Sequence, residues 1–133
     1  MNAVAQAFAL LAALTHVAVW VLESFLIERP AIHQGVFRIA TADVPAIRLW
    51  SFNVGFYNLF LAAAPITGLV ALHTGNETVG WALVIYGCAF MFLAGIVLGI
   101  SDRMALGRAK GEGLGGAFGQ SLPPLIALAA AAT

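Results

Sequence analysis

Two ionisable side chains occupy the first apolar stretch of the chain. His16 and Glu23 occur in "THVAVWVLE", with only apolar residues and Trp20 between them. If this stretch is helical, seven residues bring the chain back to nearly the same face, so His16, Trp20 and Glu23 form one stripe. An imidazole and a carboxyl group can move a proton, pair with an ion or hydrogen-bond to a ligand. This stripe is therefore the first candidate site.

A second polar group lies in "SFNVGFYNLFLAAA", at positions 51–64. Asn53 and Tyr57 are four residues apart and share a helical face, and Asn58 follows directly. Gln120 adds a third amide near the start of the last apolar run. With the first stripe, the set contains an acid, an imidazole, a phenol and three amides. These residues become candidates for ligand binding if the helices bring them together.

The composition indicates what kind of protein carries these groups. The chain has 133 residues, of which 62% are apolar and 9% are charged, whereas a soluble domain has about 25% charged residues. We therefore expect a membrane protein with a single domain, residues 1–133, in contact with the lipid bilayer. Six basic and six acidic residues cancel, so nothing in the charge indicates a nucleic-acid partner.

Four apolar runs are long enough to cross a hydrocarbon core of about 30 Å, which takes about 20 helical residues. We place these helices near 3–27, 49–72, 79–100 and 114–132. The breaks between them, "ERPAIHQGVFRIATADVPAIR", "HTGNET" and "SDRMALGRAKGEG", carry the proline, glycine and polar residues of loops. The runs do not alternate as barrel strands do. The predicted fold is all-α, an integral membrane four-helix bundle.

The basic residues predict the orientation of this bundle. All six lie in, or at the edges of, the first and third loops: Arg29, Arg38, Arg48, Arg103, Arg108 and Lys110. Lysine and arginine are retained on the cytoplasmic side of membranes. We therefore expect these two loops to be cytoplasmic and both termini to be extracytoplasmic, in a multi-pass protein of the bacterial inner (cytoplasmic) membrane.

With this orientation, the polar residues inside the helices lie between the cytoplasmic surface and about mid-membrane. A charged side chain in the membrane centre costs about 2.5–3.5 kcal/mol on insertion scales, so such groups turn toward one another. His16 and Glu23 lie about 10.5 Å apart along the helix axis, at a rise of 1.5 Å per residue. Asn53 and Tyr57 have the right depth to fill the gap between them, and we expect them to do so.

Two interpretations of this polar set compete. In the first, the residues form an interhelical hydrogen-bond network that fixes packing, with each bond contributing about 0.6 kcal/mol. In the second, they line a pocket in the cytoplasmic half of the bundle that binds or passes a small ligand. Packing needs one or two amides, whereas this set also holds an acid, an imidazole and a phenol. We therefore favour the second interpretation.

The same residues resemble a known family. His16 and Glu23, then Asn-x-Gly-x-Tyr-Asn followed by Phe-Leu-Ala in "NVGFYNLFLA", then Gln120 with Pro123 in "QSLPPLIAL", are similar to the small four-helix membrane proteins of domain-of-unknown-function family 1304. The resemblance spans almost the whole chain, and the Asn-x-Gly-x-Tyr-Asn element is its most specific part. It implies a four-helix integral membrane fold and brings no established activity.

No metal site is predicted, and the sequence leaves the cofactor unknown. Cys88 is alone, so no thiolate cluster is available within the chain. His33 and His73 lie in loops on opposite sides of the membrane, and His16 is in a helix, so no two histidines have the spacing of a zinc helix. His16 and Glu23 would supply only two ligands to a metal.

Two Gly-x-x-x-Gly pairs, Gly95 with Gly99 and Gly115 with Gly119, allow a close approach of helices. The partner helix lies either inside the bundle or in the second copy of a homodimer, and we favour the inside.

Three classes of function follow from these observations. The first is a module that binds or passes a small ligand. The second is a membrane-embedded enzyme in which His16 or Glu23 transfers a proton. The third is an accessory subunit of a larger membrane complex, whose partner satisfies the polar face. No nucleophile paired with a base supports catalysis, so we place ligand binding first.

Overall fold

The chain is helical along most of its length. The computed structural model describes all 133 residues, with 79% in helices and no strands. The elements in order are α1 (Ala3–Phe25), α2 (Pro30–His33), the 3-10 helix η1 (Thr41–Asp43), α3 (Val44–His73), α4 (Glu77–Arg103) and α5 (Leu114–Ala131). Four of them, α1, α3, α4 and α5, are long and apolar enough to cross a membrane. The predicted all-α membrane bundle is confirmed.

The helix bounds differ from the prediction mainly at α3. This helix begins at Val44 rather than near residue 49, and Pro45 lies in its first turn. The sequence assigned Pro45 to a loop, but proline is tolerated in the first turn because the N–H it lacks has no partner there. The first loop also holds the two short helical elements α2 and η1, which the apolar pattern could not indicate.

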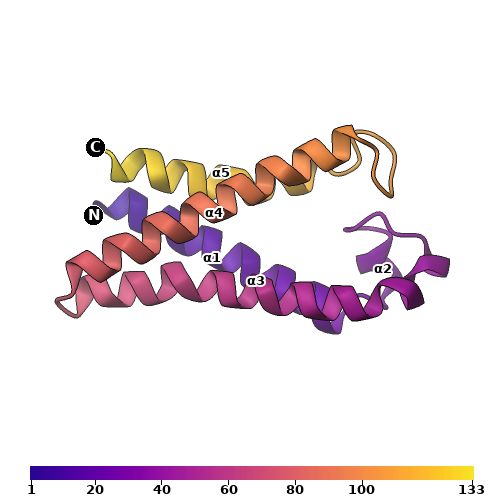
Figure 1. Ribbon diagram of the computed structural model, residues 1–133, viewed down its shortest axis with the longest axis horizontal. Coiled ribbons are helices and arrows are strands. Elements are labelled where there is room, and N and C mark those ends of the chain that lie inside the picture. The colour runs from indigo at the N-terminus through magenta and orange to yellow at the C-terminus, as the bar shows by residue number, and fades with distance from the viewer.

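The four long helices pack in a ring in the order α1, α3, α4, α5. Figure 1 shows both termini beside the turn between α3 and α4, and α2 and the α4–α5 loop at the opposite end. We call the end with the termini and residues 74–76 the terminal end. The end with residues 26–43 and 104–113 is the loop end.

The bundle is tightly closed at the terminal end. Ala9, Val84, Cys88 and Ala127 form a buried cluster there, contributed by α1, α4 and α5. A Cβ atom added at Gly68 of α3 would lie 2.9 Å from the backbone oxygen of Gly80 in α4. Such small residues let helix backbones approach closely. In the terminal half α4 therefore packs closely against its neighbours, and the space that remains there is an open groove of about 490 Å³ between α1 and α3.

Toward the loop end the ring separates into two helix pairs, α1 with α3 and α4 with α5 (Figure 1). The first pair crosses where Gly55 packs against Ser24 and the backbone of Trp20. The second pair crosses where Gly95 packs against Ser121. The two pairs leave a space between them, and the candidate site lies in this space.

The glycine pairs behave differently from each other. Gly95 is packed inside the bundle, as expected, and a Cβ atom added at Gly99 would lie 3.7 Å from the Cβ of Ala117. Gly115 and Gly119 have no neighbour within 4 Å of an added Cβ. The second pair does not make the close helix contact that was expected inside the bundle, because α5 meets α4 at Ser121 and Ala117 instead.

Candidate functional site

A cavity of about 520 Å³ lies between the two helix pairs in the loop half of the bundle. All four long helices and both segments of the loop end contribute to its wall. Its polar lining includes Glu23 of α1, Asn58 of α3 and Gln120 of α5, and its apolar lining includes Val19, Leu22 and Val97. Three of the residues predicted from the sequence therefore face one cavity.

Asn58 joins the histidine and the acid that the sequence placed on one stripe. His16 Nδ1 lies 2.7 Å from Asn58 Oδ1, and Asn58 Nδ2 donates to Glu23 Oε2 at 2.9 Å. The same Nδ2 also donates to the backbone oxygen of Val54 at 3.1 Å. Because the amide oxygen can only accept, His16 donates from Nδ1. We call these three side chains the His16–Asn58–Glu23 chain.

The position of Asn58 corrects one expectation. Asn53 and Tyr57 were expected to fill the gap between His16 and Glu23, but Asn53 Nδ2 donates to the backbone of Leu49 in its own helix. Tyr57 is 66% exposed. The predicted depth along α3 was right, but the predicted rotation of α3 about its axis was wrong. Asn58, one residue after Tyr57 and about 100° around the helix from it, fills the gap.

Trp20 is also part of the predicted stripe, but it does not line the larger cavity. Its ring packs edge-on against Phe25 and Phe56, with centroid distances of 5.5 and 5.7 Å. Its indole Nε1 is buried without a hydrogen-bond partner, and so is His16 Nε2 one turn earlier on α1. His16 is only 2% exposed. An imidazolium would bury a second unpaired N–H here, so the geometry fits a neutral imidazole.

Asp102 and Arg108 were not among the candidate site residues, and of the two only Arg108 lines the cavity. Asp102 is buried at the end of α4 and accepts hydrogen bonds from the backbone N–H of Gly111, at 2.8 Å, and of Gly113, at 2.6 Å. Arg108 Nε lies 3.7 Å from Asp102 Oδ1, and Arg108 Nη1 donates to the backbone oxygen of Phe37 at 3.4 Å. These contacts fold the α4–α5 loop against the first loop.

One sequence signal could have indicated this fold of the loop. A carboxylate at a helix end, followed by glycines that expose their N–H groups, is a typical arrangement for a side chain that caps a turn. Gly111 adopts a φ of +97°, which a residue with a side chain rarely does. The stretch from Asp102 to Gly113 carries both features.

His33, a buried histidine outside the cavity, fixes the first loop. Its Nδ1 donates to the backbone oxygen of Ile27 at 3.0 Å, and its Nε2 accepts from the hydroxyl of Thr41 at 3.0 Å. Both ring nitrogens are therefore used within the loop. The structure contains no group of three histidine, cysteine, aspartate or glutamate side chains that could hold a metal ion.

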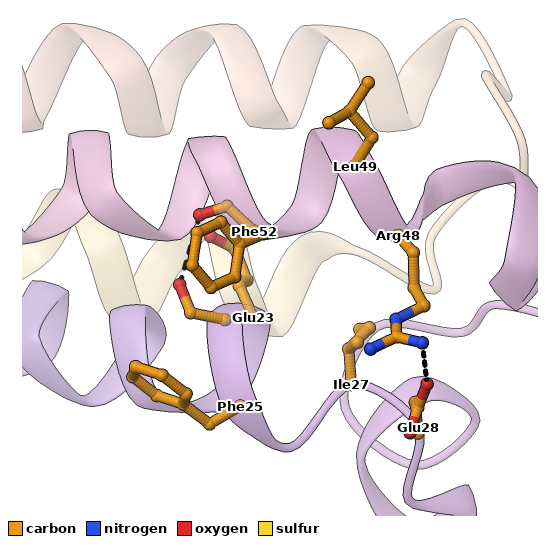
Figure 2. Close-up of a pocket in the computed structure, with 8 residues that line it drawn as sticks. Glu23, Phe25, Ile27, Glu28, Arg48, Leu49 and Phe52 are labelled. Atoms are coloured by element: carbon orange, nitrogen blue, oxygen red, sulfur yellow. Dashed lines mark hydrogen bonds and ion pairs between the residues drawn. The ribbon is translucent and has the colours of Figure 1, made fainter.

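A smaller cavity of about 240 Å³ lies where α1 ends and α3 begins (Figure 2). Arg48 Nη1 and Glu28 Oε1 form an ion pair of 2.7 Å at its edge, with side chains 65% and 59% exposed, so the pair contributes at most about 1 kcal/mol. Glu23 borders both cavities. The Glu23 carboxyl group accepts a hydrogen bond from Asn58, and Asn58 lines only the larger cavity. We therefore assign Glu23 to the larger cavity.

Comparison with known proteins identifies a family. The model for the family described as "Protein of unknown function (DUF1304)" matches residues 10–132. The match includes every residue of the His16–Asn58–Glu23 chain and Gln120. No curated protein and no solved structure matches the chain.

Proposed function

Because the chain belongs to the DUF1304 family of proteins of unknown function, we propose its function from the geometry of its own site. The protein binds a small molecule in the cavity between the two helix pairs. A volume of about 520 Å³ lies within the range of about 300–1,000 Å³ that is usual for small-ligand sites. Eight of its 18 lining residues are hydrophobic and seven have polar or charged side chains, and a combination of apolar surface with convergent polar groups is usual for such sites.

One observation supports this proposal: some polar groups that line the cavity have no hydrogen-bond partner, although the network around Asn58 is complete. Asn58 uses both of its amide hydrogens and its oxygen within the protein. Glu23 Oε1 and the amide of Gln120 have no hydrogen-bond partner in the protein, although both residues line the cavity. A polar group within a membrane raises the free energy of the folded protein when it has no hydrogen-bond partner. A ligand that hydrogen-bonds to them accounts for their presence.

Binding is supported better than passage across the membrane. The cavity lies in the loop half, while Ala9, Val84, Cys88 and Ala127 fill the terminal half. Gly68 and Gly80 hold α3 and α4 in backbone contact there. A molecule could cross only if these helices separated, so the cavity is closed at one end.

A matched pair of glycine substitutions tests this function. Gly119 lines the cavity and an added Cβ there meets no atom within 4 Å, so Gly119→Leu should fill part of the cavity without displacing a helix. Gly115→Leu adds the same side chain on α5 in open space outside the cavity. We expect mass spectrometry of purified protein to find a small molecule bound to the wild type and to Gly115→Leu, and at least tenfold less of it on Gly119→Leu. If no bound molecule is lost in Gly119→Leu, ligand binding in this cavity is contradicted.

We further propose that the protein lies in a bacterial inner membrane with both termini outside. The six basic residues all lie at the loop end or in the adjoining helix turns, and such residues favour the cytoplasmic side. Thr74, at the terminal end, and Ala109, at the loop end, are both exposed.

Cysteine labelling tests this orientation. In intact cells, an impermeant thiol reagent should modify Thr74→Cys and leave Ala109→Cys unmodified, whereas both should react after the cells are lysed. The wild type is the control, because its only cysteine, Cys88, is 1% exposed. Labelling of Ala109→Cys alone in intact cells would reverse the orientation.

A further inference from the structure

The charges that line the larger cavity do not balance. Glu23 and Glu112 contribute two carboxylates, and Arg108 contributes one guanidinium. That guanidinium is already engaged by Asp102, at 3.7 Å, and by the backbone oxygen of Phe37. Asp102 is itself 1% exposed, so its charge needs the cation beside it. The cavity therefore presents an excess of negative charge to an occupant.

Glu23 has no positive partner within the protein. The two ion pairs of the structure join Arg48 to Glu28 and Arg108 to Asp102. The only side chain that hydrogen-bonds to the Glu23 carboxyl group is the neutral amide of Asn58. His16 donates to the same amide as a neutral imidazole and supplies no charge. A carboxylate in a low-dielectric site is stabilised by an opposite charge within about 4–6 Å, and an occupant of the cavity is placed to supply it.

The wall around Glu23 is apolar. Val19 and Leu22 of α1, Val54 of α3 and Val97 of α4 line the same cavity. An occupant that places a charged group beside Glu23 must therefore place its other atoms among aliphatic side chains. Burial of that apolar part stabilises the complex by about 25 cal/mol per Å² of apolar surface removed from water.

From these observations we propose that the ligand is an amphipathic organic cation, with a protonated amine against Glu23 and an apolar body among the valine and leucine side chains. This inference rests on the proposed function and adds the chemical class of the ligand. Anionic ligands would meet two carboxylates and no free cation in the cavity. Neutral ligands would supply no charge to a Glu23 carboxylate, which would then take up a proton instead.

Three probes with one carbon skeleton test the charge preference: 4-phenylbutylamine, 4-phenylbutan-1-ol and 4-phenylbutanoate. Their dissociation constants are measured by calorimetry at pH 7.5 with the full chain in nanodiscs of neutral phospholipid, and empty nanodiscs give the blank. We expect the amine to bind at least tenfold more tightly than the alcohol or the carboxylate. Equal or tighter binding of the alcohol or the carboxylate would overturn the inference.

Substitutions then test whether the preference for the amine arises at Glu23. Glu23→Gln should weaken binding of the amine at least tenfold and leave that of the alcohol unchanged, because it removes the charge and keeps the volume. Glu77→Gln removes a carboxylate from the first turn of α4 at the terminal end and should bind the amine as the wild type does. Gly119→Leu should also lose the amine and Gly115→Leu should keep it, which gives a second test if Glu23→Gln does not fold.

The outcomes separate this inference from the proposed function. If amine binding survives in Glu23→Gln, or if none of the three probes binds, the cation inference is overturned. The proposed function is decided by the molecule that co-purifies with the wild type and depends on Gly119. A neutral or anionic molecule found in that experiment would support the function and refute the inference.

Discussion

Replacing Asn58 by alanine should lower the free energy of unfolding by about 1–3 kcal/mol, the cost of leaving buried polar groups without partners. Asn58 is the only link between His16 and Glu23. Its loss strands the Nδ1–H of an imidazole that is 2% exposed, and removes the hydrogen bond to the carboxyl group. Unfolding of the purified protein by sodium dodecyl sulfate in mixed micelles, followed by circular dichroism, measures the change.

Asn53→Ala is the matched control for this experiment. Asn53 lies in the same helix, but its side chain is exposed and bonds only to the backbone of Leu49 in its own helix. We expect a change within about 0.5 kcal/mol, as for other surface substitutions. If the two variants lose the same stability, the His16–Asn58–Glu23 chain does not hold α1 to α3.

The second large effect is expected at the terminal end, where Gly68→Ala should destabilise the bundle by about 1–3 kcal/mol through overpacking. The new Cβ would lie 2.9 Å from the backbone oxygen of Gly80 and 2.9 Å from Val84 Cγ2. The first of these atoms belongs to the backbone of α4 and cannot turn away as a side chain can. The whole helix would have to shift, and the same unfolding assay should detect the loss.

Gly115→Ala is the control for the glycine effect itself. An added Cβ at Gly115 meets no atom within 4 Å, and replacing glycine by alanine at a compatible position stabilises a protein by about 0.4–1 kcal/mol because the unfolded chain loses freedom. This variant should therefore be slightly more stable than the wild type. Similar stability in Gly68→Ala and Gly115→Ala would show that the contact between α3 and α4 tolerates a methyl group.

Apolar runs predicted the four spanning helices because a membrane requires long uninterrupted hydrophobic segments. The start of α3 was missed because the first turn of a helix can hold Pro45 and lie outside the apolar run. The stripe of His16 and Glu23 was predicted from helical periodicity, and both side chains do meet one residue of α3. Periodicity fixes which residues share a face on one helix.

The rotation of one helix relative to another was not available from the sequence. Asn53, Tyr57 and Asn58 lie at similar depth, and only packing decides which of them faces α1. Tyrosine tolerates a lipid-facing position near the membrane surface because its ring is apolar and its hydroxyl can reach polar groups. Gly55, three residues before Asn58 and on the same face of α3, packs against α1, and Asn58 faces α1 with it. The cavity itself depends on the separation of the helix pairs, which no local pattern encodes.

The bond from Asn58 to the backbone oxygen of Val54 has a consequence for proton conduction. A proton could pass from His16 toward Glu23 only if the amide between them turned over, because an amide does not relay protons as water or a carboxyl group does. Turning over would set Asn58 Oδ1 against the oxygen of Val54, two acceptors that repel each other. The backbone of α3 therefore holds the Asn58 amide in one orientation, and no proton passes through it from His16 to Glu23. Protons can therefore reach Glu23 from the two cavities that it borders, and not through the amide from the histidine two turns away.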